Sequence, residues 1–489
     1  MNFNSINYII FLPIVSALYF AIPKKQKNLY LLAVSYFFYF CNEVRFFFLL
    51  PILSFITYLF GLSLEKNKKK SVFILSLAAN IGTLLFFKYN RFFFETISRF
   101  ADIKFNPSKW LLPMGISFYI FMAVSYLIDI YKGKYHAEKN FIKFAVYISF
   151  FPHILMGPID RADKFIPQLD EEHKFSYDRT RTALQLMAFG FFKKIAVADI
   201  LAMFINQVHS DLTSYTGLML IFTAVMYSFQ LYADFSGYCD IARGSAMILG
   251  FDIAENFRVP YLATSIKDFW RRWHITLSGW FTEYIYFPLG GSRVNKTRHL
   301  ANLFIVFLVS GIWHGNTINF IIWGALHGTY QIIEQLLTKY KGKSLESKNT
   351  ISRIFKTCLT FTLVTFGWIF FRCKDVPSSI FYVTHMFSDI SISTFKRGLY
   401  ESVKSGFDAT AILIYAYIAY IIMSTTIMII MDFVRNFSLK GQCLTTIFIN
   451  MKPWKRWLCY YALVALIMAG FIMNNGGYGA SASFIYNNF

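Results

Sequence analysis

The chain has 489 residues, of which 56% are hydrophobic and 20% aromatic, and its formal net charge is +21. A soluble domain does not carry so much apolar surface. The basic residues lie between long apolar runs, so the charge indicates contact with anionic membrane lipids and excludes a nucleic-acid-binding protein.

Apolar runs of about 17 or more residues with few charges predict helices that cross a membrane. The clear ones are Tyr8 to Ile22, Phe46 to Leu62, Val72 to Phe87, Trp110 to Tyr131, Gly217 to Ala233, Leu303 to Ile333, Cys358 to Phe371, Ala409 to Met431 and Trp457 to Met473. Shorter candidates bring the expected number to about 11 to 13, some of them broken or re-entrant. The predicted fold class is therefore an all-α, polytopic integral membrane protein.

Basic clusters between these runs predict the orientation of the chain. They lie at Lys24 to Lys27, Lys66 to Lys70, Lys132 to Lys143 and Lys339 to Lys356. Such clusters favour the cytoplasmic side, which puts the N-terminus outside the cytoplasm. The first apolar run lacks a charged start and a small-residue cleavage site, so we expect a retained helix and not a cleaved signal peptide.

Charged residues inside two apolar segments need partners. Lys193 and Lys194 lie in the segment Gly190 to Asp199, and Asp234 follows Gln230 on the same face of the next span. Either the lysines extend to the membrane interface or the segment is buried beside a polar cavity. A structural ion-pair network is the simpler interpretation, with Lys193, Lys194, Arg271 or Arg272 as the cations. We also expect Gly237 to break the span between Asp234 and Asp240.

A polar, aromatic block lies between residues 256 and 298. Trp270, Trp273 and Trp280 alternate with Arg271, Arg272 and His274. This pattern is typical of an amphipathic helix at the membrane interface, ended by the turn at Phe287 to Gly291. Two interpretations stay open. The block either only anchors the fold, or it forms the wall of a substrate cavity in which Arg271 and Arg272 hold a phosphate-bearing donor.

The apolar stretch from Ala301 to Ile333 contains two histidines, His314 and His327. As one straight helix it would be about 50 Å long, against a hydrocarbon core of about 30 Å. It must break, and Gly311, Gly315 and Asn316 are the expected place, which puts Trp313 and His314 at the break. A neutral imidazole there can act as a general base toward a hydroxyl, oriented by Asp234 or Asn316. His327 is either a second site residue or a hydrogen-bonded structural one.

An ordered set of motifs resembles the membrane-bound O-acyltransferase family, in the bacterial branch that includes alginate O-acetyltransferases and D-alanyl transfer proteins. The motifs are Phe269-Trp270-Arg271-Arg272-Trp273-His274, Pro288-Leu289-Gly290-Gly291, Gly311-Ile312-Trp313-His314-Gly315, Trp323-Gly324-x-x-His327-Gly328 and, near the end, Phe484-Ile485-Tyr486. Two departures from the pattern are Thr282-Glu283-Tyr284, where relatives show Arg-Asp-Tyr, and Asp160, where an apolar residue is common. The missing arginine bears on donor or partner specificity.

The resemblance implies one domain of many helices around a central funnel. Residues 1–109 would be an N-terminal scaffold, 110–373 the catalytic core and 374–489 C-terminal helices. It also implies that His314 is the catalytic residue, as a general base or as a transient carrier of the acyl group, that His274 is a second one, and that a separate extracytoplasmic protein passes the acyl group on to a glycan. We add a substrate-binding set: Arg271, Arg272, Trp270, Trp313, Asp234 and His327.

Together with this resemblance, the sequence predicts an enzyme of the bacterial cytoplasmic membrane that moves an acyl group from a cytoplasmic thioester toward hydroxyls of an envelope polysaccharide. The acyl group that we expect is acetyl. Acetyl-CoA or another acyl thioester would be the donor, with no bound cofactor. The six cysteines are scattered without metal-ligand spacing, so no metal site is expected. The alternatives are D-alanyl transfer from a carrier protein to teichoic acid, a transporter of envelope precursors, and a non-catalytic scaffold of an export complex.

Overall fold

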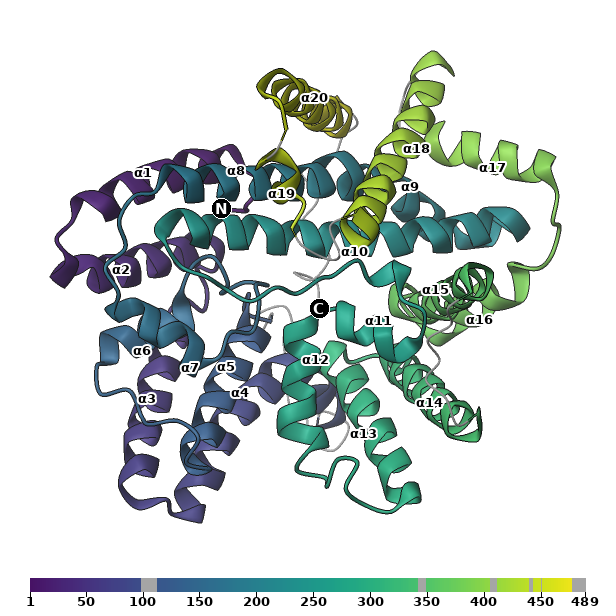
Figure 1. Ribbon diagram of the computed structural model, residues 1–489. Coiled ribbons are helices and arrows are strands. Elements are labelled where there is room, and N and C mark those ends of the chain that lie inside the picture. The colour runs from purple at the N-terminus through teal and green to yellow at the C-terminus, as the bar shows by residue number, and fades with distance from the viewer. Residues whose placement is uncertain (98–111, 342–348, 405–410, 439–442, 450, 477–489) are drawn as a thin grey trace. The chain divides into compact units, whose positions relative to one another are not determined.

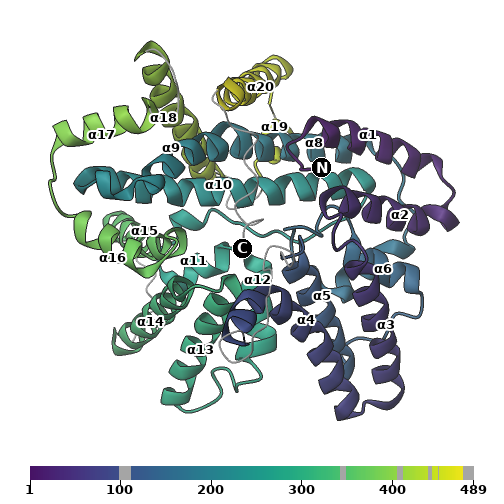
Figure 2. The same ribbon diagram turned by 180° about the vertical axis from the view of Figure 1, so that it is seen from behind.

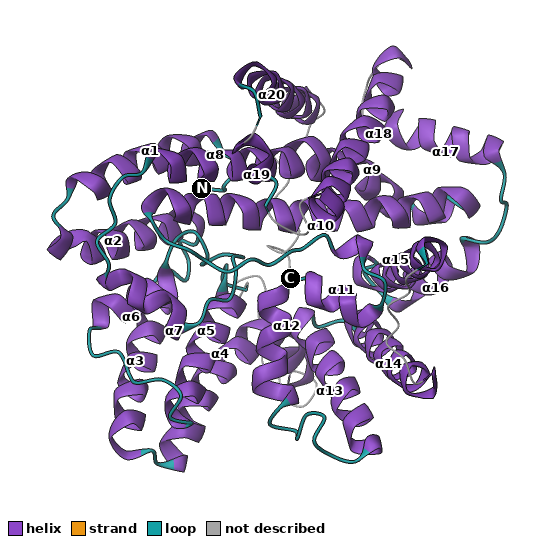
Figure 3. Ribbon diagram, viewed as in Figure 1, coloured by secondary structure: helices purple, strands orange, loops and turns teal. Residues whose placement is uncertain are grey.

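The computed structural model describes residues 1–97, 112–341, 349–404, 411–438, 443–449 and 451–476. Throughout these ranges the regular secondary structure is helical (Figure 3). The chain forms two compact units: residues 1–184 with 242–255, and residues 185–241 with 256–489. The motif Phe484-Ile485-Tyr486 lies outside the described residues. The division at residues 109 and 373 stays a prediction.

Six described helices are long and apolar enough to cross a membrane. They are Leu49–Asn67, Lys70–Asn90, Gly217–Leu249, Thr350–Arg372, Ala411–Ser438 and Pro453–Asn474. Two shorter apolar helices are Ile6–Ala21 and Ile116–Tyr131. The predicted class, an all-α polytopic membrane protein, is confirmed. The expected total of about 11 to 13 segments also counts shorter and more polar helices that do not meet this criterion.

The first unit is built from the N-terminal helices. They are α1 (Ile6–Ala21), α2 (Lys24–Asn42), α3 (Leu49–Asn67), α4 (Lys70–Ile97), α5 (Ile116–Tyr131), α6 (Phe141–Ser149), α7 (Ala162–Phe165) and η2 (Ile166–Asp170). Nearly every residue of α5 is buried, because α3 and α4 pack against it. His153 is fully buried, 3.2 Å from Asp160 through Nδ1 and 3.0 Å from the Tyr147 carbonyl through Nε2. Asp160, unusual for the family pattern, thus partners a structural histidine.

The second unit contains the remaining helices (Figure 1). They are η3 (Phe192–Ala198), α9 (Asp199–Ser210), η4 (Leu212–Ser214), η5 (Pro260–Leu262), α11 (Ile266–Arg272), α12 (Ile275–Phe281), η6 (Thr282–Tyr286), α13 (Lys296–His314), α14 (Ile318–Lys341), α15 (Thr350–Arg372), α16 (Val376–His385), α17 (Ile392–Lys404), α18 (Ala411–Phe433), η7 (Val434–Ser438), α19 (Thr445–Ile449) and α20 (Pro453–Gly476). Two further helices, α8 (Tyr177–Phe191) and α10 (Gly217–Leu249), contribute residues to both units.

Polar side chains cap the N-termini of helices α13, α15 and α16. The side chain of Asn295 accepts the N–H of Arg298 at the start of α13, and Asn349 accepts that of Ile351 at the start of α15. Asp375 does the same for Ser378 in α16. These caps satisfy backbone donors that no carbonyl of the same helix can reach, so they set where each helix begins.

Gly237 does not break its helix, contrary to expectation, because α10 is continuous from Gly217 to Leu249. A Cβ atom at Gly237 would lie 2.8 Å from the carbonyl oxygen of Gly190, and one at Gly190 would lie 2.7 Å from that of Gly237. The two glycines therefore let neighbouring backbones approach closely, as small residues do where membrane helices pack. The glycine serves packing and not a turn.

The aromatic block is not one interfacial helix. It forms two short helices, α11 and α12, separated at Trp273 and His274, and His274 adopts a left-handed conformation with φ 42°. The backbone turns at this point because Ile275 donates its N–H to the carbonyl of Asn256 and Arg258 donates to that of Arg272. The turn after Phe287 is present as expected, with positive φ at Gly290 and Gly291.

The long apolar stretch breaks where the sequence predicts. Helix α13 ends at His314 and α14 begins at Ile318, and the two run side by side (Figures 1 and 2). They form an antiparallel hairpin, because Gly324 meets the Phe307 carbonyl and Gly328 meets Phe304. With 19 and 24 residues, the helices are about 28 and 36 Å long, so the stretch folds back on itself at the break.

Candidate functional site

His314 is the last residue of α13, and its side chain is 4% exposed. Aromatic rings surround the imidazole: ring centroids of Trp313, Trp323 and Phe371 lie 4.5, 4.9 and 5.1 Å away. These rings come from α13, α14 and α15. A Cβ at the next residue, Gly315, would lie 2.1 Å from the ring of Phe320, so only glycine lets this ring close over the turn. The histidine is thus held in an aromatic wall at one end of three helices.

A continuous set of indole rings connects this wall to the aromatic block; we call Trp270, Trp273, Trp323 and Trp368 the tryptophan cluster. Trp273 of the block lies 5.1 Å from Trp368, and Trp368 stacks on Trp323 at 5.9 Å. Trp323 is the member that contacts His314. Three of the four are at most 1% exposed, so packed rings extend without interruption from the block to His314.

His327 lies inside the tryptophan cluster. Trp270 donates its indole N–H to Nδ1 of His327 over 3.3 Å, and the two rings meet edge to face at 5.1 Å. Accepting this bond at Nδ1 places the imidazole proton on Nε2. Nε2 faces Gly367, where a Cβ would come within 2.9 Å. Trp270 and His327, both predicted site residues, are therefore brought together, between two and three helical turns along α14 from its start at Ile318.

His274 is buried in a different environment. Its ring meets Phe235 edge to face at 4.8 Å, and Nδ1 lies 3.4 Å from Oδ1 of Asn256. Asn256 also accepts the hydroxyl of Thr276 at 2.6 Å. Burial lowers the pKa of His274 to about 3, so the imidazole is neutral at pH 7. A joint role of His274 and His314, the two predicted catalytic histidines, stays a prediction.

Arg271 and Arg272 differ in what holds them. Nε of Arg272 lies 2.8 Å from the Asp268 carboxylate and Nη1 lies 3.0 Å from the amide oxygen of Asn436, so this guanidinium is held by its neighbours. Arg271 is exposed and has no ion pair within the described part of the chain. Of the two predicted donor-binding arginines, Arg271 is the one whose guanidinium stays available.

Asp234 belongs to a buried ion-pair network. The ammonium group of Lys194 lies 2.7 Å from Asp234 and 2.8 Å from Asp199, and Lys193 lies 2.7 Å from Asp240. Lys194 is 1% exposed. The lysines are thus buried with acid partners and do not extend to the membrane interface. The ion-pair network is the interpretation that agrees with these contacts. The expectation that Asp234 orients His314 stays a prediction.

The motif-bearing part of the chain matches a known family. Residues 135–373 match the model of the membrane-bound O-acyltransferase family. A probable alginate O-acetylase from Pseudomonas syringae pv. tomato is 35% identical over 425 residues, which cover 84% of this chain and 79% of the relative. The chain belongs to the membrane-bound O-acyltransferase family. It is therefore an acyltransferase, as the motifs predicted, and the transporter and scaffold interpretations are set aside.

Two further relatives of this O-acyltransferase differ in what they act on. A peptidoglycan O-acetyltransferase from Helicobacter pylori is 33% identical over 405 residues, 76% of each chain. A teichoic acid D-alanyltransferase from Bacillus subtilis is 30% identical over 283 residues, which cover 55% of this chain and 70% of the relative. The more extensive similarity is thus to proteins named for O-acetyl transfer.

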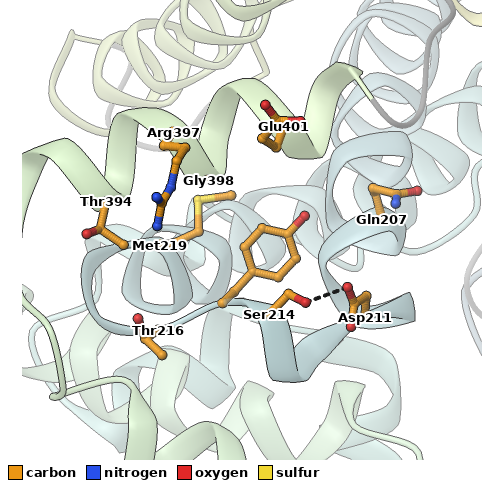
Figure 4. A pocket seen from close by; sticks show the side chains of 10 residues that line it. Gln207, Asp211, Ser214, Thr216, Met219, Thr394, Arg397, Gly398 and Glu401 are labelled. Atoms are coloured by element: carbon orange, nitrogen blue, oxygen red, sulfur yellow. Dashed lines mark hydrogen bonds between the residues drawn. The ribbon is translucent and has the colours of Figure 1, made fainter.

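Two pockets open beside the end of α9 in this O-acyltransferase. One, of about 330 Å³, is lined from α9, η4, the start of α10 and α17, and includes Gln207, Asp211, Arg397 and Glu401 (Figure 4). The hydroxyl of Ser214 donates to Asp211 at 2.6 Å within it. This pocket contains no histidine and none of the predicted site residues. The other, of about 270 Å³, includes His209 and Arg372.

The residues that prediction missed are Trp323, Trp368 and Phe371, which the structure places against His314 or in the tryptophan cluster. Trp323 stands in the motif that contains His327, so the motif itself was a signal. Trp368 and Phe371 lie in an apolar span rich in aromatic residues, and nothing local distinguishes them. In the described residues no three His, Cys, Asp or Glu side chains are grouped to hold a metal ion.

Proposed function

We propose that this O-acyltransferase transfers an acetyl group from a cytoplasmic thioester to hydroxyls of a cell-envelope polysaccharide, with His314 as the catalytic residue. The observation that carries the proposal is the position of His314, a buried imidazole at a helix end, enclosed by Trp313, Trp323 and Phe371. The acetyl group and the polysaccharide acceptor follow from the names of the relatives with the most extensive similarity.

The orientation expected from the basic clusters supports a donor on the cytoplasmic side of the membrane and an acceptor on the other side. The end of α14 and the start of α15 lie in the basic stretch 339–356, which favours the cytoplasm. His314 lies at the other end of α14, and α15 returns to that end with Phe371. A thioester entering from the cytoplasm and a glycan outside would then meet at His314. As part of the same proposal, the basic clusters at Lys24 to Lys27 and Lys66 to Lys70 put the N-terminus outside the cytoplasm, and the membrane is the bacterial cytoplasmic membrane.

The chemistry requires one proton acceptor at the hydroxyl. A ring nitrogen of His314 takes the hydroxyl proton while the oxygen attacks the thioester carbonyl. The C–O ester bond forms, the C–S bond breaks, and the departing thiolate receives the proton from the imidazole. A second route has the imidazole take the acyl group first and pass it to the hydroxyl. Both routes need His314, and the aromatic wall keeps water from competing with the acceptor.

The other predicted residues receive supporting roles in this proposal. Arg271, exposed and unpaired in the described chain, would hold a phosphate of the acyl-CoA donor, while Arg272 fixes α11 through Asp268 and Asn436. Trp270, Trp313 and His327 would line the path of the acyl chain. His274 would be a second essential residue that holds the turn between α11 and α12. A separate extracytoplasmic protein would carry the acyl group onward to the glycan.

The test is acyl transfer by membranes that contain the wild type or the His314→Ala variant, with labelled acetyl-CoA on the cytoplasmic side. His136→Ala is the matched control, since the side chain of His136 is 95% exposed. Label reaching an envelope glycan with the wild type and the control, and lost in His314→Ala at equal amounts of folded protein, is the expected result. Equal transfer by His314→Ala would overturn the assignment of the site.

A second donor is favoured by one observation, the similarity to the teichoic acid D-alanyltransferase. The same membranes are therefore offered a carrier protein charged with D-alanine in place of acetyl-CoA. Transfer from the carrier alone would keep the catalytic assignment of His314 and replace both the donor and the acyl group. Transfer from acetyl-CoA alone is the expected result.

A further inference from the structure

Three buried ring nitrogens in and beside the tryptophan cluster have no hydrogen-bond partner among the described residues. They are Nε1 of Trp323, Nε1 of Trp368 and Nε2 of His327. Each of these side chains is at most 1% exposed. A buried polar group without a partner is costly, so native proteins keep few of them, and a role in the reaction is one reason for keeping one.

The protonation of His327 is set by its neighbour. Trp270 donates its indole N–H to Nδ1 of the imidazole over 3.3 Å. A ring nitrogen that accepts a hydrogen bond carries no proton, so the imidazole is neutral and its proton is on Nε2. His327 is therefore held as a hydrogen-bond donor, and not as a base, at the atom that has no partner in the described part of the chain.

The N–H edges of His327 and Trp323 face the same place on α15. A Cβ atom at Gly367 would lie 2.9 Å from Nε2 of His327 and 3.7 Å from Cδ1 of Trp323, the ring carbon bonded to its Nε1. A side chain at Gly367 would press on both edges, so glycine keeps this place clear. Trp368, which carries the third nitrogen, is the next residue of α15, and its ring stacks on Trp323 at 5.9 Å.

One indole separates His327 from His314. The ring centroid of Trp323 lies 4.9 Å from that of His314 and 5.1 Å from that of His327. If a hydroxyl bonded to one imidazole attacks a carbonyl bonded to the other, the two ring nitrogens are about 6–9 Å apart, since each hydrogen bond takes about 3 Å. A separation of this order is what one intervening ring provides.

We propose that His327 is an electrophilic catalytic residue: its Nε2–H donates a hydrogen bond to the carbonyl oxygen of the acyl thioester, and the indole N–H of Trp323 is a second donor. The inference rests on the proposed function and adds to it the groups that stabilise the negative charge. A neutral imidazole can polarise a carbonyl in this way. A carbonyl oxygen only accepts hydrogen bonds, so it suits a place that offers donors better than a water molecule does.

His327 keeps its proton throughout the reaction. When the acceptor oxygen attacks, His314 takes the hydroxyl proton, the C–O bond forms, and the electron pair of the carbonyl moves onto its oxygen. The N–H groups of His327 and Trp323 stabilise this oxyanion, because no water competes with them in a buried aromatic site. The electron pair then re-forms the carbonyl, the C–S bond breaks, and the thiolate receives the proton from His314. Attack by the imidazole of His314 itself would produce the same kind of oxyanion.

A structural role of His327 makes a different prediction. An N–H group can lie against the face of an aromatic ring, and the rings of Trp323 and Trp368 are 5.1 and 6.1 Å from that of His327. If the N–H groups make only such contacts, removing them changes the melting temperature and leaves a bound carbonyl unaffected. Only hydrogen bonds to the acyl group make the vibration of its carbonyl depend on His327 and Trp323.

The experiment is infrared difference spectroscopy on the purified full-length protein in detergent. The probe is an analogue of S-acetylpantetheine, the arm that acetyl-CoA shares with charged carrier proteins. A methylene group between the sulfur and an isotope-labelled carbonyl prevents acyl transfer, and the result does not depend on which of the two donors the enzyme uses.

The variants separate the N–H groups from the rings. His327→Phe and Trp323→Phe keep a ring and lose the N–H group, whereas His327→Gln keeps an amide N–H near the place of Nε2. His136→Phe and Trp454→Phe are the matched controls, because the side chain of His136 is 95% exposed and Trp454 is 63% exposed.

We expect the carbonyl band of the bound analogue to move to higher frequency in His327→Phe and Trp323→Phe, because the carbonyl loses a hydrogen bond. It should stay close to the wild-type position in His327→Gln and in both controls. In transfer from acetyl-CoA, His327→Phe should lower kcat about 100-fold with KM nearly constant, because the hydrogen bond strengthens in the transition state. His327→Gln should recover part of this loss.

An unchanged band in folded His327→Phe and Trp323→Phe overturns the proposal and assigns the N–H groups to packing, whatever happens to the melting temperature. Equal loss of kcat in His327→Phe and His327→Gln also counts against it. The spectrum is recorded with His314→Ala as well, because the probe needs no catalysis. Normal transfer by His314→Ala would refute the proposed function, and the band of the bound analogue would still decide the role of His327.

Discussion

The indole of Trp270 donates a hydrogen bond to Nδ1 of His327 and lies 5.8 Å from the indole of Trp323, so it joins the aromatic block to α14. Trp323 in turn lies against both His327 and His314. In our interpretation His327 therefore also has a positioning role: it holds the indole of Trp270 by a hydrogen bond and packs against Trp323, which forms part of the wall around His314.

Replacing Trp270 with Phe should test this link. The ring contacts with Trp323 and Phe307 are largely kept, but the hydrogen bond to His327 is lost. We expect the free energy of unfolding to fall by about 1 kcal/mol, and acyl transfer to fall less than in His314→Ala. Trp454→Phe is the control, since Trp454 is 63% exposed. A variant with full activity and unchanged stability would show that the bond is dispensable.

The α13–α14 hairpin should tolerate no side chain at Gly324. A Cβ there would lie 2.4 Å from the Phe307 carbonyl oxygen, so the helices must separate. We expect Gly324→Ala to lower the free energy of unfolding by about 1–3 kcal/mol and to reduce transfer, because the His314 turn shifts. At Gly279 in α12 a Cβ meets nothing within 4 Å, so Gly279→Ala should be neutral or stabilising. Thermal unfolding in detergent measures both, and equal melting temperatures would contradict the close approach.

Removing Lys194 should be among the most damaging single changes outside the wall around His314. It would leave the buried carboxylates of Asp199 and Asp234 without their shared cation, at a cost of about 3–5 kcal/mol. We expect Lys194→Met to accumulate poorly in membranes. The triple variant Lys194→Met, Asp199→Asn, Asp234→Asn removes the charges together and should recover much of the folded protein. Recovery of protein without recovery of activity would point to a further role of Asp234 in the reaction.

Stability should decrease as the pH falls from 7 to 5. The pKa of His274 is about 3 in the folded protein against an ordinary value of 6.5, so between these values the unfolded chain binds a proton that the folded chain does not. Each such histidine lowers the free energy of unfolding by up to about 1.4 kcal/mol per pH unit. His209 and His173, whose pKa values are also lowered by burial, add to the slope.

The variant that isolates this effect is His274→Asn, because asparagine tolerates the left-handed backbone of this position. Its melting temperature should depend less on pH than that of the wild type. An unchanged pH dependence would mean that His274 is not neutral in the folded protein.

The sequence was sufficient to predict the break at His314, because the largely apolar stretch of 33 residues is longer than the membrane is thick and glycines mark one place in it. It was not sufficient at Gly237, where a glycine of the same kind packs against Gly190 from another helix. It also predicted that Asp234 needs a cation, but not which one. The local sequence pattern is enough to predict the length and polarity of a segment. It does not predict contacts between residues far apart in the chain, such as Phe371 and His314, because these depend on tertiary packing.

Arg271 and Arg272 provide a comparison of two adjacent arginines with different surroundings. Arg272 is held by Asp268 and Asn436, so Arg272→Gln should lower the melting temperature, through loss of charged hydrogen bonds worth about 1.5–3 kcal/mol at most. Arg271 is exposed, so Arg271→Gln should leave the melting temperature unchanged and raise KM for acetyl-CoA about tenfold, with kcat nearly constant, because it would remove binding shared by the ground and transition states. The ionic-strength dependence of KM should weaken in the same variant. If KM for acetyl-CoA is unaffected in Arg271→Gln, the donor's phosphates lie elsewhere and the block only anchors the fold.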